Sequence, residues 1–111
     1  DNELIFESID LFMESSSSRL KALQTAVAAK NAEQIMAEAH ALKGVVGIFS
    51  PGDVMDAAKD LEFMGRNNDL ANVEAALTKF EGLLGELTKL LEEWKEEEGD
   101  LEYEDDDEDE D

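Results

Sequence analysis

The sequence predicts an all-α protein, an antiparallel up-down-up-down bundle of four helices. Only one proline occurs in 111 residues, and Ala, Leu, Glu and Lys are abundant, which favours helix over sheet. Apolar residues recur at helical spacing in four segments that are separated by short polar breaks. Connections this short place neighbouring helices antiparallel, and the length suits one domain, which we place at residues 1–95.

The first predicted helix runs from about residue 4 to about residue 30. Four consecutive serines at 15–18 have weak helix propensity, so this helix is expected to bend or divide there. Its apolar positions share one face and predict a buried stripe made of Ile5, Ile9, Phe12, Leu20, Leu23 and Val27.

The second predicted helix follows Asn31 and runs to about Phe49. Asn31 is a favoured N-cap residue, and Gln34 stands three residues later, as in a capping box. The expected inward face consists of Ile35, Met36, Ala39, Leu42, Val46 and Phe49. Ser50 and Pro51 then predict the start of a third helix, because serine caps helices and proline suits the first helical position.

The third predicted helix ends at about Gly65 and the fourth at about Glu97. The polar residues 66–69 form a turn in which Asn68 or Asp69 would cap the last helix. Gly82 and Gly85 destabilise that helix, so they predict the close approach of a neighbouring helix. The expected buried residues of these two helices are Val54, Ala57 or Ala58, Leu61, Met64, Val73, Leu77, Phe80, Leu84, Leu87, Leu91 and Trp94.

The formal charge of −21 is concentrated at one end of the chain. Residues 96–111 hold 13 acidic and no basic side chains, and the other 95 residues hold 17 acidic and 9 basic ones. We therefore expect a disordered acidic tail at 96–111, either a solubilising end or a site for cations or a basic partner. The charge disfavours nucleic-acid binding, and no apolar run is long enough to cross a membrane. The absence of cysteine excludes disulfides and fits a cytoplasmic protein.

Four residues of the second helix share its outward face, because His40, Lys43, Gly44 and Gly47 are spaced at i, i+3, i+4 and i+7. Glycine costs about 1 kcal/mol relative to alanine inside a helix, so two of them suggest room for a phosphoryl group or another protein's active site. An imidazole that is partly neutral at pH 7 is a nitrogen nucleophile, and Lys43 can bind phosphate oxygens. An inert surface histidine with glycines that serve helix packing is the alternative interpretation.

The segment Ala39-His40-Ala41-Leu42-Lys43-Gly44 resembles the His-x-Leu-Lys-Gly signature of histidine-containing phosphotransfer (HPt) domains. The resemblance covers about residues 4–94 and extends to the Phe12…Leu20-x-x-Leu23…Ala26 pattern and to Leu61-Glu62…Arg66. It departs from the family at Ser50-Pro51, where Gly-Ala is usual, and this difference is expected to alter only the turn. The acidic tail is not part of the resemblance.

The resemblance implies a phosphorelay intermediate. His40 would accept a phosphoryl group from a receiver-domain aspartate and pass it to another receiver, without kinase or phosphatase activity of its own. Lys43 would stabilise the phosphoryl group, and Gly44, with Gly47, would give steric access. Glu62 would either orient His40 through the inner ring nitrogen or be a solvated helix residue, and Arg66 would serve docking or capping.

The implied partners are response-regulator receiver domains, with a hybrid sensor histidine kinase as a further candidate. We expect a monomer without a cofactor or metal, and Mg²⁺ on the partner receiver domain. A non-catalytic helical module that binds a receiver or kinase is the alternative function, and an acidic chaperone-like or nucleic-acid-mimicking protein is a third. An independent enzyme is disfavoured, because the sequence has no phosphate-cradling glycine loop and only one histidine.

Overall fold

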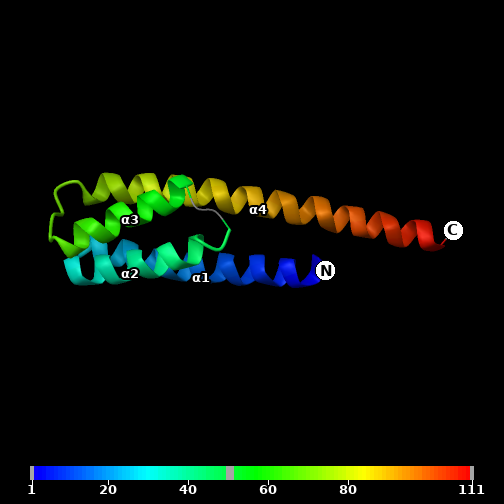
Figure 1. The fold of residues 1–111 in the computed structure, drawn as a ribbon, viewed down its shortest axis with the longest axis horizontal. Helices are drawn as coiled ribbons and strands as arrows, with labels where there is room; N and C mark the ends of the chain where they lie inside the picture. Colours follow the sequence, from blue (N-terminus) through cyan, green and yellow to red (C-terminus); the bar gives the residue numbers. More distant parts are fainter. Residues whose placement is uncertain (1, 50–51, 111) are drawn as a thin grey trace.

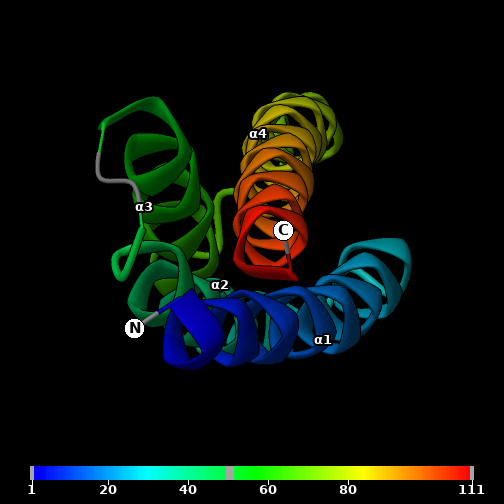
Figure 2. The same ribbon diagram turned by 90° about the vertical axis from the view of Figure 1, so that its right-hand side faces the viewer.

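The computed structural model describes the backbone of residues 2–49 and 52–110 and the side chains of residues 3–49 and 52–98. Its elements are α1 (Asn2–Ala28), α2 (Ala32–Val46), α3 (Gly52–Arg66) and α4 (Val73–Glu110). Consecutive helices run in opposite directions (Figure 1), and the view turned by 90° shows α2 beside both α1 and α3 (Figure 2). The predicted all-α antiparallel bundle is confirmed.

The core lies between the four helices and largely follows the predicted apolar stripes. Ile5 is an exception at 42% exposure, because α1 projects past the ends of α2 and α3 in this region (Figure 1). The predicted core residues that are only partly buried are Leu20, Met36, Phe49, Met64, Leu77, Leu91 and Trp94. The fully buried large side chains are Ile9, Leu23, Ile35, Leu42, Val46, Leu61, Val73 and Phe80.

The serine run does not divide the first helix, since α1 is continuous from Asn2 to Ala28. Ser16 faces the core with 3% exposure, and its hydroxyl donates to the backbone oxygen of Met13 at 3.2 Å. This bond satisfies the buried hydroxyl within the helix, so the serine is accommodated without a break.

The N-cap of α2 is confirmed, because the Asn31 side chain accepts a hydrogen bond from the Gln34 backbone nitrogen at 3.2 Å. The predicted cap of α4 is wrong. Asn68 has a φ of 53° and lies just after α3, where the Asp69 nitrogen donates to the Met64 oxygen at 2.9 Å. Asn68 therefore ends α3 in a left-handed conformation, and α4 begins only at Val73.

Other helix ends also differ from the predicted ones. α2 ends at Val46 instead of about Phe49, and α4 continues to Glu110, past the predicted end near Glu97. The separation of residues 96–111 as a tail stays a prediction, and Ser50 and Pro51 lie outside the described residues. Within the described part of the chain, no helix has the length and hydropathy needed to span a membrane.

Candidate functional site

α3 approaches α2 very closely at Gly65. A Cβ atom on Gly65 would lie 2.6 Å from the backbone nitrogen of Met36 and 2.7 Å from the backbone oxygen of Ala32. Only glycine fits there, because a backbone cannot give way as a flexible side chain can. Gly82 and Gly85 have open space at the same position, so the prediction that they mark a close approach is wrong.

This approach fixes which residues of α2 and α3 face each other. The two helices are antiparallel, so one turn forward along α2 from Met36 meets one turn back along α3 from Gly65. That step brings His40 to Glu62. Further along, Gly47 meets Met55, whose methyl carbon would lie 2.8 Å from a Cβ on Gly47. The register therefore places a carboxylate from α3 beside the histidine of α2.

The imidazole of His40 is exposed on one side and hydrogen-bonded on the other. Its side chain is 68% exposed, and its Nδ1 lies 2.9 Å from Oε2 of Glu62. An ionised carboxylate can only accept, so Nδ1 carries the proton and donates it. In the neutral form of this ring, Nε2 is the unprotonated nitrogen and the nucleophilic atom.

Glu62 is a buried carboxylate with three charged or polar partners. Its side chain is only 6% exposed, and Oε1 lies 2.9 Å from Nζ of Lys43. Oε2 accepts from Nη2 of Arg66 at 2.8 Å in addition to His40. The hydrogen bond from Lys43 is the largest effect and holds the pKa of Glu62 below its ordinary value of 4.5, against the opposing effect of burial; the contact with His40 adds to it. Glu62 is therefore an anion at neutral pH.

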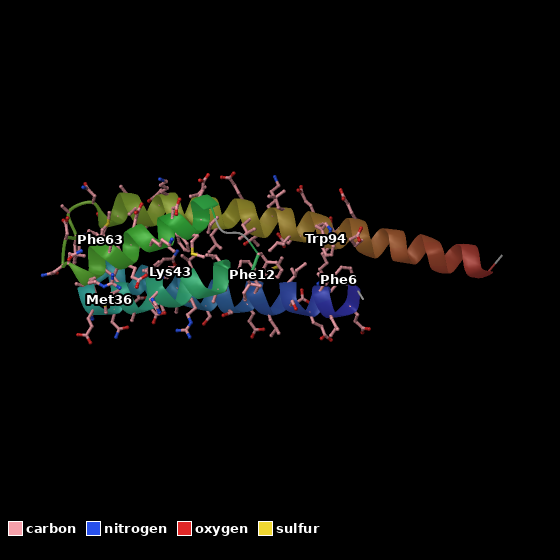
Figure 3. The ribbon with its side chains drawn as sticks, viewed as in Figure 1. Phe6, Phe12, Met36, Lys43, Phe63 and Trp94 are labelled. Carbon is pink, nitrogen blue, oxygen red and sulfur yellow. The ribbon has the colours of Figure 1, made fainter. Side chains whose placement is uncertain are left out.

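A shallow groove lies between α2 and α3 and begins about one turn after His40 along α2. A Cβ on Gly44 would have no atom within 4 Å, so the surface one turn after His40 is open. Lys43 forms one edge of the groove and is 29% exposed; it is labelled with Met36 on α2 in Figure 3. The residues that line this groove are Lys43, Gly44, Gly47, Ile48, Met55 and Lys59.

The structure brings most of the predicted site residues together. His40, Lys43, Glu62 and Arg66 form one connected network, and Gly44 borders it. Of the two interpretations of Glu62, the structure supports the contact with the inner ring nitrogen and not the solvated residue. Gly47 lies just after α2 as its C-cap, where its missing side chain makes room for Met55.

Two residues that help form the site are not predicted from the sequence. The sequence predicts only that the third helix ends at about Gly65, although this glycine sets the distance between α2 and α3. Lys59 adds a second cation to the groove. Its signal was available, because Lys59, Glu62 and Arg66 are spaced at i, i+3 and i+7 on one face of α3.

The described side chains include no group of three or more histidine or acidic residues placed to hold one metal ion. The site instead combines one nucleophilic nitrogen with several cations around a buried anion. Such a set can accept a phosphoryl group and offset its negative charge.

Comparison with known proteins agrees with this chemistry. Residues 7–101 match the family described as the Hpt domain. The chain belongs to the Hpt family. Comparison of the sequence with curated proteins finds no significant match.

The Hpt fold is also found by structural comparison. The crystal structure of histidine-containing phosphotransfer protein B from Pseudomonas aeruginosa PAO1 is similar, with a TM-score of 0.77. The two sequences are 23% identical, and the similarity covers 81% of this chain and 78% of the other. Hpt domains carry phosphoryl groups on histidine and interact with the receiver domains of two-component systems, so this Hpt chain is a phosphorelay intermediate.

Proposed function

We propose that His40 is the phosphoacceptor of this Hpt domain. It takes a phosphoryl group from the phospho-aspartate of one receiver domain and passes it to an aspartate of another. The observation that supports this most directly is the geometry of its ring, with Nδ1 bonded to buried Glu62 and the side chain 68% exposed, so that Nε2 is left for the phosphoryl group. His40 is also the only histidine of the sequence.

In the forward step, the lone pair of Nε2 attacks phosphorus and forms the N–P bond. The bond between phosphorus and the aspartate oxygen breaks, and the carboxylate leaves with the electron pair. Lys43 stabilises the phosphoryl oxygens, since its Nζ and the His40 ring contact the two oxygens of one carboxylate and a lysine side chain is flexible. Transfer of this kind depends mainly on positioning and charge neutralisation.

The groove beside His40 is the proposed docking site for the receiver domain. Ile48 is 70% exposed at its edge and offers apolar contact, and Lys43 and Lys59 supply positive charge for an acidic receiver pocket. Open space at Gly44 lets the partner's reacting aspartate approach Nε2. The receiver supplies Mg²⁺, and its source is a response regulator or the receiver domain of a hybrid sensor histidine kinase.

We further propose that the domain acts as a monomeric cytoplasmic carrier without kinase or phosphatase activity of its own. Its site supplies a nucleophile and cations, and the sequence has no glycine loop that could cradle a nucleotide. The phosphoryl group therefore enters and leaves through the partner's active site.

Phosphotransfer from a receiver domain tests this function. Mixing the chain with a receiver that carries ³²P-phosphate should give label on the chain that is lost in acid and kept in base. His40→Gln should abolish the label, because no other histidine is available. Label on the variant, or an unlabelled wild type with every receiver tried, would contradict the proposal. A wild type that binds receivers without taking label would instead be a non-catalytic binding module.

A pair of glycine substitutions tests steric access. Gly44→Gln should block transfer, because its side chain would occupy the open surface next to His40. Gly82→Gln is the matched control, since Gly82 on α4 is equally open and distant from the site in sequence. Circular dichroism shows whether both variants keep the helical fold. Equal transfer by both variants would show that Gly44 does not provide access.

A further inference from the structure

The contact between Glu62 and His40 has a consequence for the phosphorylated state, and this inference rests on the proposed function. When Nε2 gains a phosphoryl group, the ring still carries the Nδ1 proton and becomes a phospho-imidazolium. We propose that Glu62 keeps this proton on Nδ1 and so holds phospho-His40 in the labile form that readily gives the phosphoryl group to the next receiver.

The difference between the two forms lies in the leaving group. From the phospho-imidazolium, the N–P bond breaks with its electron pair returning to Nε2, and the ring leaves as neutral imidazole with the Nδ1 proton in place. If that proton is lost, the ring must leave as an imidazolate anion or wait for another proton. With the proton kept, neither acceptance nor donation of the phosphoryl group requires a proton to move.

Glu62 is suited to this role because it is an anion in a buried place. Its Oε2 is 2.9 Å from Nδ1, and the side chain is 6% exposed, so solvent screens its charge less than that of a surface carboxylate. A glutamine would offer a neutral amide there. Its NH₂ group could turn to donate to an unprotonated Nδ1, which would stabilise the less reactive form.

The other charges around the ring fit an exchange of partners. Lys43 comes from α2 and binds Oε1 of Glu62 at 2.9 Å before phosphorylation. A phosphoryl group on Nε2 attracts Lys43 away from Glu62. Arg66, which lies on α3 with Glu62 and whose Nη2 is 2.8 Å from Oε2, stays paired with it. Glu62 thus keeps Arg66 as a counter-ion. The part of its negative charge that Lys43 no longer neutralises can then stabilise the positive ring of phospho-His40.

The remaining charges near α2 do not replace Glu62. Lys59 of α3 lines the groove and is positive, so it would favour loss of the ring proton. Arg19 of α1 pairs with Glu38 at 3.4 Å. Glu38 precedes His40 by two residues, so it points to the opposite side of α2. Among the described side chains, Glu62 is the carboxylate that contacts the ring of His40.

The test uses the whole chain phosphorylated chemically with phosphoramidate, which requires no cognate receiver. The rate at which phosphate is lost is measured against pH for the wild type and for Glu62→Gln. We expect a flat wild-type rate between about pH 6 and about pH 8, and a Glu62→Gln rate that falls about tenfold across this range as the ring loses its proton. Asp60→Asn also removes one negative charge from α3, but at an exposed position, and this variant should behave like the wild type.

A spectroscopic measurement keeps the test independent of how well the variant folds. The ¹⁵N chemical shift of Nδ1 in phosphorylated wild type should report a protonated nitrogen up to about pH 8, beyond the range in which histidine ordinarily loses its proton. Loss of the Nδ1 proton below neutral pH, or identical pH profiles for the wild type and Glu62→Gln, would overturn the inference. In that case label on His40 would still support the proposed function, whereas a wild type that takes no label from phosphoramidate or any receiver would contradict the function itself.

Discussion

The α2–α3 interface and the α1–α4 interface hold the same bundle together by different means. Between α2 and α3, the backbones approach so closely at Gly65 that no side chain fits, and a buried carboxylate binds three polar partners. Between α1 and α4, the rings of Phe6 and Trp94, both labelled in Figure 3, meet edge to face with their centres 5.9 Å apart. The ion pair of Lys95 with Asp10 between these helices lies at the surface.

This difference separates the part of the molecule that performs chemistry from the part that supports it. An apolar and aromatic interface tolerates changes in its surface charges, because its stability comes mainly from buried area. A tight interface around a buried ion is sensitive to small changes. It has no space for an added methyl group, and the loss of one charge leaves buried polar partners without a hydrogen bond. Placing Glu62 in the tight interface is what gives His40 a fixed partner.

The largest loss of stability is expected from a substitution of Gly65. Gly65→Ala adds a Cβ 2.6 Å from the Met36 backbone nitrogen, so α3 must move away from α2. We expect the free energy of unfolding to fall by about 3 kcal/mol, as measured by urea denaturation followed by circular dichroism. Phosphotransfer should fall as well, because the shift separates Glu62 from His40.

Gly85→Ala is the matched control on α4. Its Cβ would meet nothing within 4 Å, so the higher helix propensity of alanine should raise the free energy of unfolding by up to about 1 kcal/mol. Equal effects of the two substitutions would show that the α2 and α3 backbones do not approach closely at Gly65, and the contrast between the two interfaces would be wrong.

The second prediction concerns how the contribution of Glu62 to stability depends on pH. Its pKa is lowered in the folded chain, chiefly by Lys43, so its ionisation contributes stability above about pH 4.5, its ordinary value, and loses that contribution as the pH falls through the lowered folded value. At neutral pH we expect Glu62→Gln to be about 2 kcal/mol less stable, because charge-assisted hydrogen bonds are weakened. Urea denaturation should show this difference shrinking as the pH falls below about 4. A difference that stays constant to low pH would mean that the charge of Glu62 does not support the interface.

The contrast between these interfaces also explains how far the sequence could predict the site. His40, Lys43 and Gly44 could be placed on one face, because the period of a single helix fixes their relation. The contact between His40 and Glu62 depends on the register of two helices, and no pattern within either helix determines it. Only the family resemblance pointed to Glu62, and it left two roles open.

Helix ends and glycines show the same limit. The N-cap at Asn31 was predicted correctly, because capping is a local interaction with Gln34. Gly65, Gly82 and Gly85 all lie in helices. The sequence predicts a close helix approach at Gly82 and Gly85, but the structure shows it at Gly65. The backbone that makes a glycine necessary belongs to another helix, so a pattern within one helix cannot reveal it. Residues that act across two helices are therefore the ones that the structure had to supply.

The third prediction sharpens the chemical side of the comparison. Lys43→Ala removes the cation that stabilises the phosphoryl group and should slow phosphotransfer about tenfold, the equivalent of about 1.4 kcal/mol. The fold should survive, because Arg66 still binds Glu62 and the Lys43 side chain is partly exposed. Transfer rates from a labelled receiver and a urea denaturation curve measure the two effects separately. Lys89→Ala, an exposed change on α4, is the control and should leave both unchanged.

The smallest effect is expected at the α1–α4 interface. Nζ of Lys95 lies 2.5 Å from Oδ1 of Asp10 and 5.9 Å from the centre of the Phe6 ring. Asp10 is 61% exposed, so water and salt screen the pair, and we expect Lys95→Ala to cost about 0.5 kcal/mol. A double-mutant cycle with Asp10→Ala, measured by urea denaturation at low and high salt, isolates the pair itself. A coupling energy above about 2 kcal/mol that persists in high salt would mean that an ion pair also stabilises the α1–α4 interface. Dependence on a charged group would then no longer distinguish the α2–α3 interface from the α1–α4 interface.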